Sequence, residues 1–180
     1  MHERRFQKEA KELRSDERIA LLETDRVVES CLDGLHIRSV LDVGTGTGLF
    51  AEAFAGLGVA VTGIDSNQDL LELARHYVPR AVLREATAEN LPFSDSSFDL
   101  VFLGHVLHEV DNPCKALAEA RRVASVRGSI LEWPYRTEAQ GPPLEHRLTP
   151  ETIEELARIV GYRQIDRSNL THMVLYHLIP

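Results

Sequence analysis

Long apolar runs and cysteines are scarce in this chain of 180 residues. No apolar run approaches the roughly 20 residues that a membrane-spanning helix needs. The first six residues, Met-His-Glu-Arg-Arg-Phe, do not open an apolar signal segment. The two cysteines, Cys31 and Cys114, provide no disulfide framework, and no Cys/His cluster has zinc-ligand spacing. We therefore expect a cytoplasmic protein with no membrane span and no metal.

Basic residues are in the minority. Lys and Arg number 20 against 28 Asp and Glu, which gives a formal net charge of −8. Because phosphate backbones are bound through Lys and Arg, nucleic acid is not the expected partner. The 43% hydrophobic and 27% charged residues are ordinary for a globular protein. With no internal repeat, this length predicts one domain over residues 1–180.

The chain does have a glycine-rich turn directly after a short apolar strand. Residues 40–50 read Val-Leu-Asp-Val-Gly-Thr-Gly-Thr-Gly-Leu-Phe. Glycine lets the turn tighten against a ligand, and the helix that follows presents unpaired N–H groups. The spacing differs from the dinucleotide fingerprint G-x-G-x-x-G, because Leu49 stands where the third glycine would be. Asp42, two residues before Gly44, favours a ligand that carries an amine over a pyrophosphate; an ordinary Gly-rich turn is the alternative.

A second acidic residue ends the next apolar segment, residues 59–64. Asp65 follows Gly44 by 21 residues, near the offset at which an acid binds ribose hydroxyls in doubly wound folds. One carboxylate can accept hydrogen bonds from two hydroxyls. The alternative is a cap on the helix that starts at Ser66-Asn67, and both roles are compatible.

The periodicity alternates strands and helices. Strands are predicted at 38–43, 59–64, 80–85, 98–104 and 128–134, followed by a hairpin of 162–168 and 171–178. Helices are predicted at 16–33, 48–57, 67–77, 112–125 and 150–160. This order is typical of a doubly wound, mostly parallel α/β sheet with an antiparallel addition, whose ligand site lies at the carboxyl ends of the parallel strands.

Four segments together carry a resemblance to a known family. They are Leu41–Gly48, Gly63–Ser66, Glu85–Phe93 and Ser96–Phe102. The chain resembles the class I S-adenosylmethionine (AdoMet) dependent methyltransferases from about Val40 to Val174. Within them it is most similar to the small-molecule branch that includes the ubiquinone/menaquinone C-methyltransferases.

The resemblance implies a Rossmann-like methyltransferase fold of seven strands in the order 3-2-1-4-5-7-6. It implies AdoMet as cofactor, with S-adenosylhomocysteine (AdoHcy) as product. The cofactor-binding residues implied or expected at the strand ends are Asp42, Gly44, Thr45, Gly46, Gly48, Asp65, Ser66, Ala88, Glu89, Gly104 and His105. For Glu89, a solvated loop charge is the alternative.

The acceptor side is less defined. Methyl transfer depends mainly on alignment and exclusion of water, but an acceptor can also need to lose a proton, for which histidine is suited near neutral pH. His105 and His108 are the candidate catalytic residues, with lining of the pocket as the alternative, and Glu109 could orient a histidine. The other candidates for the acceptor pocket are Trp133, Tyr135, His146 and Arg147.

Two flanking segments are expected to border the acceptor. Residues 135–149 form a short loop, and the N-terminal flank 1–35, with Phe6 and Leu13, could complete a lid.

Three other interpretations remain at this point. Pro113-Cys114 is typical of the nucleophile of cytosine methylation, but its distance from the fourth strand favours a helix start. A non-catalytic AdoMet- or AdoHcy-binding module is the main alternative to an enzyme, because the acceptor cover is short. A nucleotide-binding oxidoreductase is disfavoured by the glycine spacing and by Asp42. The acceptor itself and the oligomeric state are not readable from the sequence.

Overall fold

The computed structural model describes residues 12–180, so Phe6 lies outside the described part. Its strands are β1 (Ser39–Val43), β2 (Ala60–Asp65), β3 (Val82–Glu85), β4 (Phe98–Gly104), β5 (Ala124–Glu132), β6 (Gln164–Asn169) and β7 (Val174–Ile179). Its helices are η1 (Glu12–Arg14), α1 (Asp16–Leu22), α2 (Thr24–Leu32), α3 (Leu49–Gly56), α4 (Gln68–Tyr77), α5 (Pro113–Val123), η2 (Leu144–His146) and α6 (Pro150–Ile159).

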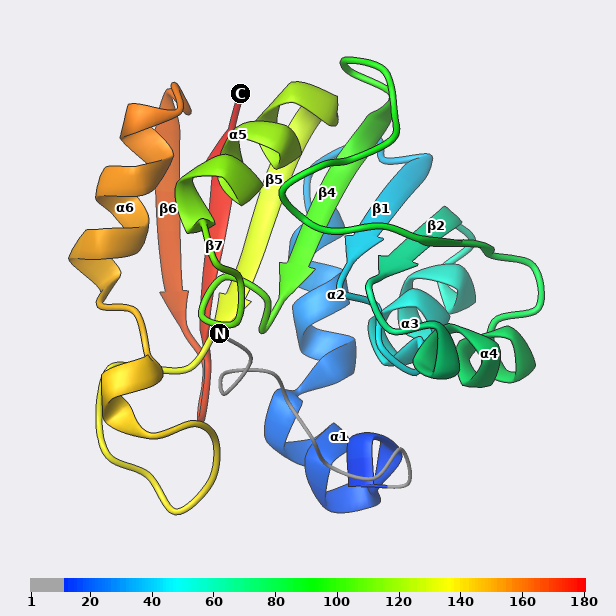
Figure 1. The fold of residues 1–180 in the computed structure, drawn as a ribbon, viewed down its shortest axis with the longest axis horizontal. Coiled ribbons are helices and arrows are strands. Elements are labelled where there is room, and N and C mark those ends of the chain that lie inside the picture. The colour runs from blue at the N-terminus through cyan, green and yellow to red at the C-terminus, as the bar shows by residue number, and fades with distance from the viewer. Residues whose placement is uncertain (1–11) are drawn as a thin grey trace.

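One seven-stranded sheet organises these elements in the order β3-β2-β1-β4-β5-β7-β6, which confirms the expected fold. The first five strands pair in parallel, and β7 pairs antiparallel with both β5 and β6. Alternate side chains of the buried strands supply two separate cores. Leu41 and Val43 pack with α5 and α6 on one face, whereas Val40 packs with α2 and α3 on the other. Figure 1 shows α5 and α6 on the face toward the viewer.

The carboxyl ends of β1, β2, β4 and β5 lie at one edge of the sheet. Figure 1 shows α1 and the loop between β5 and α6 lying beyond this edge, at the bottom of the view. Capping residues fix where the helices begin: Asn67, Asn112 and Thr149 each accept a backbone N–H with the side chain. The fold therefore gathers the loops after the parallel strands between α1 and the loop of residues 133–149.

Several boundaries differ from the sequence prediction by a few residues, and two of the differences have a clear tertiary cause. The helix expected over 16–33 is broken at Glu23, whose φ of 48° is left-handed, so α1 and α2 are separate. The Glu23 carboxylate accepts the N–H of Thr171 at 2.7 Å, a contact between residues far apart in the sequence. Strand β5 begins at Ala124, directly after α5, because Ala124 pairs with Phe98. Both differences come from tertiary contacts that periodicity does not report. No helix among residues 12–180 is long and apolar enough to cross a membrane.

Candidate functional site

The glycine-rich turn joins β1 to α3 through three residues in left-handed conformation. Gly44, Gly46 and Gly48 have φ values of 69°, 54° and 81°. A Cβ on Gly44 would lie 2.4 Å from Val106, whereas a Cβ on Gly46 would meet no atom within 4 Å. Gly44 is therefore required by close packing inside the protein, and Gly46 presents its backbone to open space, as a ligand-binding turn must.

Asp42 lies beneath this turn. Its carboxylate is 2% exposed and accepts the hydroxyl of Thr45 at 2.6 Å. Burial raises the pKa of Asp42 to about 7, opposed by the bond from Thr45 and assisted by the charge of Asp65. The sequence predicted that this carboxylate favours a ligand with an amine; in the structure one of its oxygens, Oδ2, accepts a hydrogen bond within the turn.

Asp65 connects the turn to the end of β2. One carboxylate oxygen accepts the N–H of Gly46 and the other accepts the N–H of Asn67, both at 2.8 Å. These bonds orient a half-buried carboxylate beside the exposed Ser66. The adjoining open cleft of about 540 Å³ is lined by Ser66, Arg84, Glu85, Ala86, Thr87, Asn90 and Pro92.

Ala88 and Glu89 lie in the same loop after β3. They are the central residues of a turn closed by the N–H of Asn90 bonding the carbonyl of Thr87 at 3.1 Å. Ala88 is buried and Glu89 half-buried, and neither lines the cleft. The residues that flank this turn, Thr87 and Asn90, line the cleft instead.

His105 follows β4 with a φ of 60°, held by its N–H donating to the carbonyl of Leu131 at 2.8 Å. Its imidazole is buried, and neither ring nitrogen has a hydrogen-bond partner among residues 12–180. Burial, with the charges of Arg18 and His108, holds the pKa of His105 well below its ordinary value. Because buried polar groups rarely stay unpartnered, a neutral imidazole of this kind points to a ligand. Gly104, just before it, has no room for a side chain, since a Cβ would lie 2.8 Å from the ring of Phe102.

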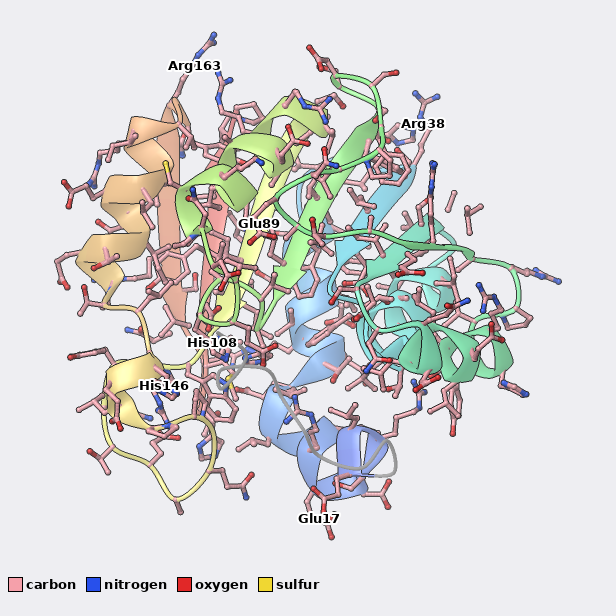
Figure 2. The ribbon with its side chains drawn as sticks, in the orientation of Figure 1. Glu17, Arg38, Glu89, His108, His146 and Arg163 are labelled. Carbon is pink, nitrogen blue, oxygen red and sulfur yellow. The ribbon has the colours of Figure 1, made fainter. Side chains whose placement is uncertain are left out.

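His108 lies in the loop after β4 and makes a buried pair with Glu132, the last residue of β5. Nδ1 of His108 is 2.8 Å from Glu132 Oε2, and Nε2 is 3.7 Å from Glu109 Oε1. Burial by itself lowers the pKa of His108, but the charge and hydrogen bond of Glu132 overcome this and raise it above its ordinary value. Figure 2 shows His108 at the carboxyl edge of the sheet, with His146 on η2 to one side and Glu17 on α1 below.

Sequence reasoning missed two residues of this group. It considered Glu109 as the partner of a histidine, but Glu132 is the close one. The signal was a charged residue at the end of the apolar run Ile130-Leu131. Arg18, on α1, was not singled out, although its charge affects His105 and is itself balanced by Glu109. Nothing in the sequence indicated that α1 lies near His105, so Arg18 could not be identified as a residue of the site from the sequence.

Trp133 is buried next to His105, whereas Tyr135 is exposed. The rings of Trp133 and His105 are 5.3 Å apart, and Trp133 is 5% exposed, against 47% for Tyr135. Gly141 packs so close to Trp133 that a Cβ there would lie 2.7 Å from the indole. Trp133 is therefore covered by the loop, and Tyr135 faces outward.

Arg147 holds this loop closed. Its guanidinium donates to the carbonyls of Pro134, Arg136, Gln140 and Pro142 at 2.8–3.1 Å and lies 5.2 Å from the centre of the Trp133 ring. The sequence placed Arg147 among the candidates for the acceptor pocket; in the structure its guanidinium donates to four backbone carbonyls of the loop. His146, beside it in η2, is half-buried.

Cys114 stands in the first turn of α5, capped by Asn112, which agrees with a helix start. Among residues 12–180, no three His, Cys, Asp or Glu side chains are grouped so as to hold a metal.

The turn with an open backbone at Gly46, the anchored Asp65 and the unpartnered imidazole of His105 fit a cofactor that carries hydroxyls and an amino-acid part. A family model described as "Methyltransferase domain" matches residues 41–131, which include all three. The chain belongs to the methyltransferase-domain family. Its cofactor is S-adenosylmethionine, which decides against the nucleotide-binding oxidoreductase.

Curated relatives agree with this family. The chain is 32% identical over 117 residues to a demethylmenaquinone methyltransferase of Renibacterium salmoninarum, covering 65% of this chain and 49% of the relative. It is 38% identical over 109 residues to a ubiquinone biosynthesis O-methyltransferase of Alkalilimnicola ehrlichii, covering 58% and 44%. This methyltransferase domain thus spans about half the length of the curated relatives that it matches.

Solved structures share the fold. A SAM dependent methyltransferase from Aquifex aeolicus superposes with a TM-score of 0.83 at 23% identity, covering 94% of this chain and 96% of that one. Phosphoethanolamine N-methyltransferase 2 of Haemonchus contortus, in complex with S-adenosyl-L-methionine, gives 0.75 at 14% identity, covering 93% and 57%. At these identities the likeness concerns the fold alone.

Proposed function

We propose that the chain is an active AdoMet-dependent methyltransferase that transfers a methyl group to a small-molecule acceptor. The observation that carries this proposal is that two groups of residues, one suited to the cofactor and one to the acceptor, lie at the same edge of the sheet. The glycine turn and Asp65 form the first group, and the buried, unpartnered His105 belongs to the second. When bound, the cofactor supplies an electrophilic methyl group on a sulfonium, so the protein has mainly to align and enclose the reactants.

On the cofactor side, we assign binding to backbone and carboxylate groups. Asp65, fixed by the N–H groups of Gly46 and Asn67, would accept the ribose hydroxyls. Ser66 and the loop of Ala88 and Glu89 would border the adenine. Gly104 and His105 would lie beside the methionine part.

On the acceptor side, we propose a quinone-related, aromatic acceptor class. Relatives are named for demethylmenaquinone and for ubiquinone biosynthesis. Trp133, whose ring is 5.3 Å from that of His105, contributes a buried aromatic side chain to the wall on this side of the site. Tyr135 and His146 belong to the covering loop, and Arg147 shapes it instead of contacting the acceptor.

We also propose that residues 1–180 act as one methyltransferase domain. The N-terminal flank 1–35 would wall the acceptor side, because Arg18 of α1 lies near enough for its charge to affect His105. The loop of residues 135–149 would form the opposite wall, and a cleft of about 280 Å³ contacts both, with Arg18 and Gln140 in its lining.

The proposal is tested in two stages. Calorimetry should show saturable binding of AdoMet and AdoHcy, lost in Asp65→Ala but kept in Asp166→Ala, a control on the exposed strand β6. Methyl-labelled AdoMet, incubated with the protein and a small-molecule fraction of cell extract, should then yield a labelled product. Failure of the folded protein to bind AdoMet would overturn the proposal. Binding without transfer to any compound would instead support the non-catalytic module.

A further inference from the structure

The buried pair of His108 and Glu132 joins the loop after β4 to the end of β5. We propose that Glu132 is a positioning residue that presents Nε2 of His108 to the acceptor, and that His108 takes the proton of an acceptor hydroxyl or amine during methyl transfer. This inference rests on the proposed function and narrows it, because it names the chemical class of the nucleophile.

Several hydrogen bonds fix the carboxylate of Glu132 in its position. It is 2% exposed, and its Oε2 is 2.8 Å from His108 Nδ1. Its Oε1 accepts the backbone N–H of His108 at 3.3 Å, and Oε2 also accepts that of Trp133 at 3.3 Å. In this pair we assign the ring proton to Nδ1, which donates to Oε2, so that the lone pair of the neutral ring is on Nε2.

Charged groups from each neighbouring element face His108. Glu132 belongs to β5, Glu109 lies in the same loop, Arg147 is in the covering loop, and the ring of His105 is 6.4 Å away. The two carboxylates favour a protonated His108, whereas Arg147 and burial oppose it. The result is a stronger base than a free imidazole, while His105, buried beside it, stays neutral.

The proton and the charge balance in this arrangement. The acceptor oxygen or nitrogen forms a bond to the methyl carbon while the carbon–sulfur bond breaks, and the electron pair of that bond stays on sulfur. The acceptor proton passes to Nε2 of His108. The positive charge lost from the sulfonium thus reappears on an imidazolium, which Glu132 is placed to stabilise. The His108–Glu132 pair would not accelerate methyl transfer to an acceptor that has no proton to lose.

The first test is a nitrogen-15 NMR titration of the 180-residue chain, which requires neither cofactor nor acceptor. His108 should show the Nδ1–H tautomer, and its titration should move to lower pH in Glu132→Gln. Glu132→Asp, which keeps the charge, should restore much of the shift. Glu155→Gln removes one carboxylate from an exposed position on α6 and should leave the His108 signal unchanged. An Nε2–H tautomer in the wild type, or an unmoved titration in folded Glu132→Gln, would overturn the positioning role.

The second test uses the labelled product formed from cell extract. The label should reside on oxygen or nitrogen, and His108→Asn should slow its formation by about 100-fold, the lower end of what a general base contributes. Because the base must be deprotonated, the rising limb of the rate–pH profile should move to lower pH in Glu132→Gln. Label on carbon or sulfur would overturn the inference. If no label is transferred at all, the proposed function fails, while the NMR titration still reports on the pair.

Discussion

Gly44, Gly46 and Gly48 share a left-handed backbone, but their missing side chains serve different needs. A side chain on Gly44 or Gly48 would collide with or crowd Val106 or Val78 within the protein. A side chain on Gly46 would collide with nothing in the protein and would project into open space. Glycine at 46 is therefore favoured by its left-handed backbone and not by close packing, and the space beside it is open to a ligand.

Gly46→Ala should separate binding from folding. Placing alanine in the left-handed region costs about 1–2 kcal/mol of stability, and the new methyl group should also obstruct AdoMet. Gly34→Ala is the matched control, because Gly34 has a φ of 69°, a Cβ on it would meet no atom within 4 Å, and it lies outside the site. Urea unfolding should give similar losses for both variants, and calorimetry should show weakened AdoMet binding only for Gly46→Ala. Equal AdoMet affinity in the two variants would contradict this assignment.

Asp42 should make stability depend on pH. Its pKa is raised by burial to about 7 from an ordinary value of 3.8, so between these limits the folded protein keeps a proton that the unfolded chain releases. Stability should therefore fall as pH rises from about 4 to 7, by up to about 1.4 kcal/mol per pH unit. The difference between wild type and Asp42→Asn, measured by urea unfolding at several pH values, isolates this contribution. A difference that is constant with pH would show that Asp42 titrates normally.

The loop between β5 and α6 shows how one side chain can order an element. It has little regular structure beyond η2, yet the four carbonyl contacts of Arg147 draw it around the indole of Trp133. The close approach of Gly141 completes the cover. The buried guanidinium of Arg147, and not a regular secondary-structure element, therefore holds the loop in its conformation.

Arg147→Met should loosen this loop, because it removes the donors and leaves four carbonyls to find water. A loss of about 2 kcal/mol or more is expected from hydrogen bonds to a charged group. Trp133 is the only tryptophan, so its emission should move to longer wavelength and become more sensitive to acrylamide. Arg136→Met, an exposed arginine of the same loop, should leave the emission unchanged. Unaltered emission in Arg147→Met would mean that the loop is held by other contacts.

At the scale of the molecule, the centre and the edges of the sheet are unequal. Strand β4 lies between β1 and β5, and Leu100, Val101, Phe102 and Leu103 are at most 1% exposed. The edge strands β3 and β6 are largely exposed along their length. The functional loops leave the rigid centre, which holds them in place at the carboxyl edge.

Hydrogen exchange should follow this gradient. Amides of β1, β4 and β5 should exchange slowest and those of β3 early, because opening the centre requires global unfolding. Addition of AdoHcy should slow exchange in residues 44–48 and 65–67 more than in β6. Mass spectrometry of peptic fragments can measure both effects. Exchange as slow in β3 as in β4, or uniform protection by AdoHcy, would contradict the expected organisation.

By itself, the sequence determined the order of elements, the family and the cofactor. The order of elements depends on local chemistry, because apolar runs define the strands, and Asn112 and Thr149 mark helix starts. The family and the cofactor came from the resemblance carried by short motifs, such as the three glycines followed by Asp65, which can be recognised without knowing what packs against them. The sequence did not predict the helix break at Glu23, because the hydrogen bond between its carboxylate and the N–H of Thr171 does not alter the periodicity of apolar residues.

Only the tertiary structure decided how the acceptor side is built. It paired His108 with Glu132 across two strand ends, brought Arg18 near His105, and turned Arg147 inward to the loop backbone. It also placed Asp42 beneath the turn, where burial changes its protonation. The physical reason is that charge, burial and hydrogen bonding at these residues depend on partners distant in the chain, and folding alone determines which partners meet.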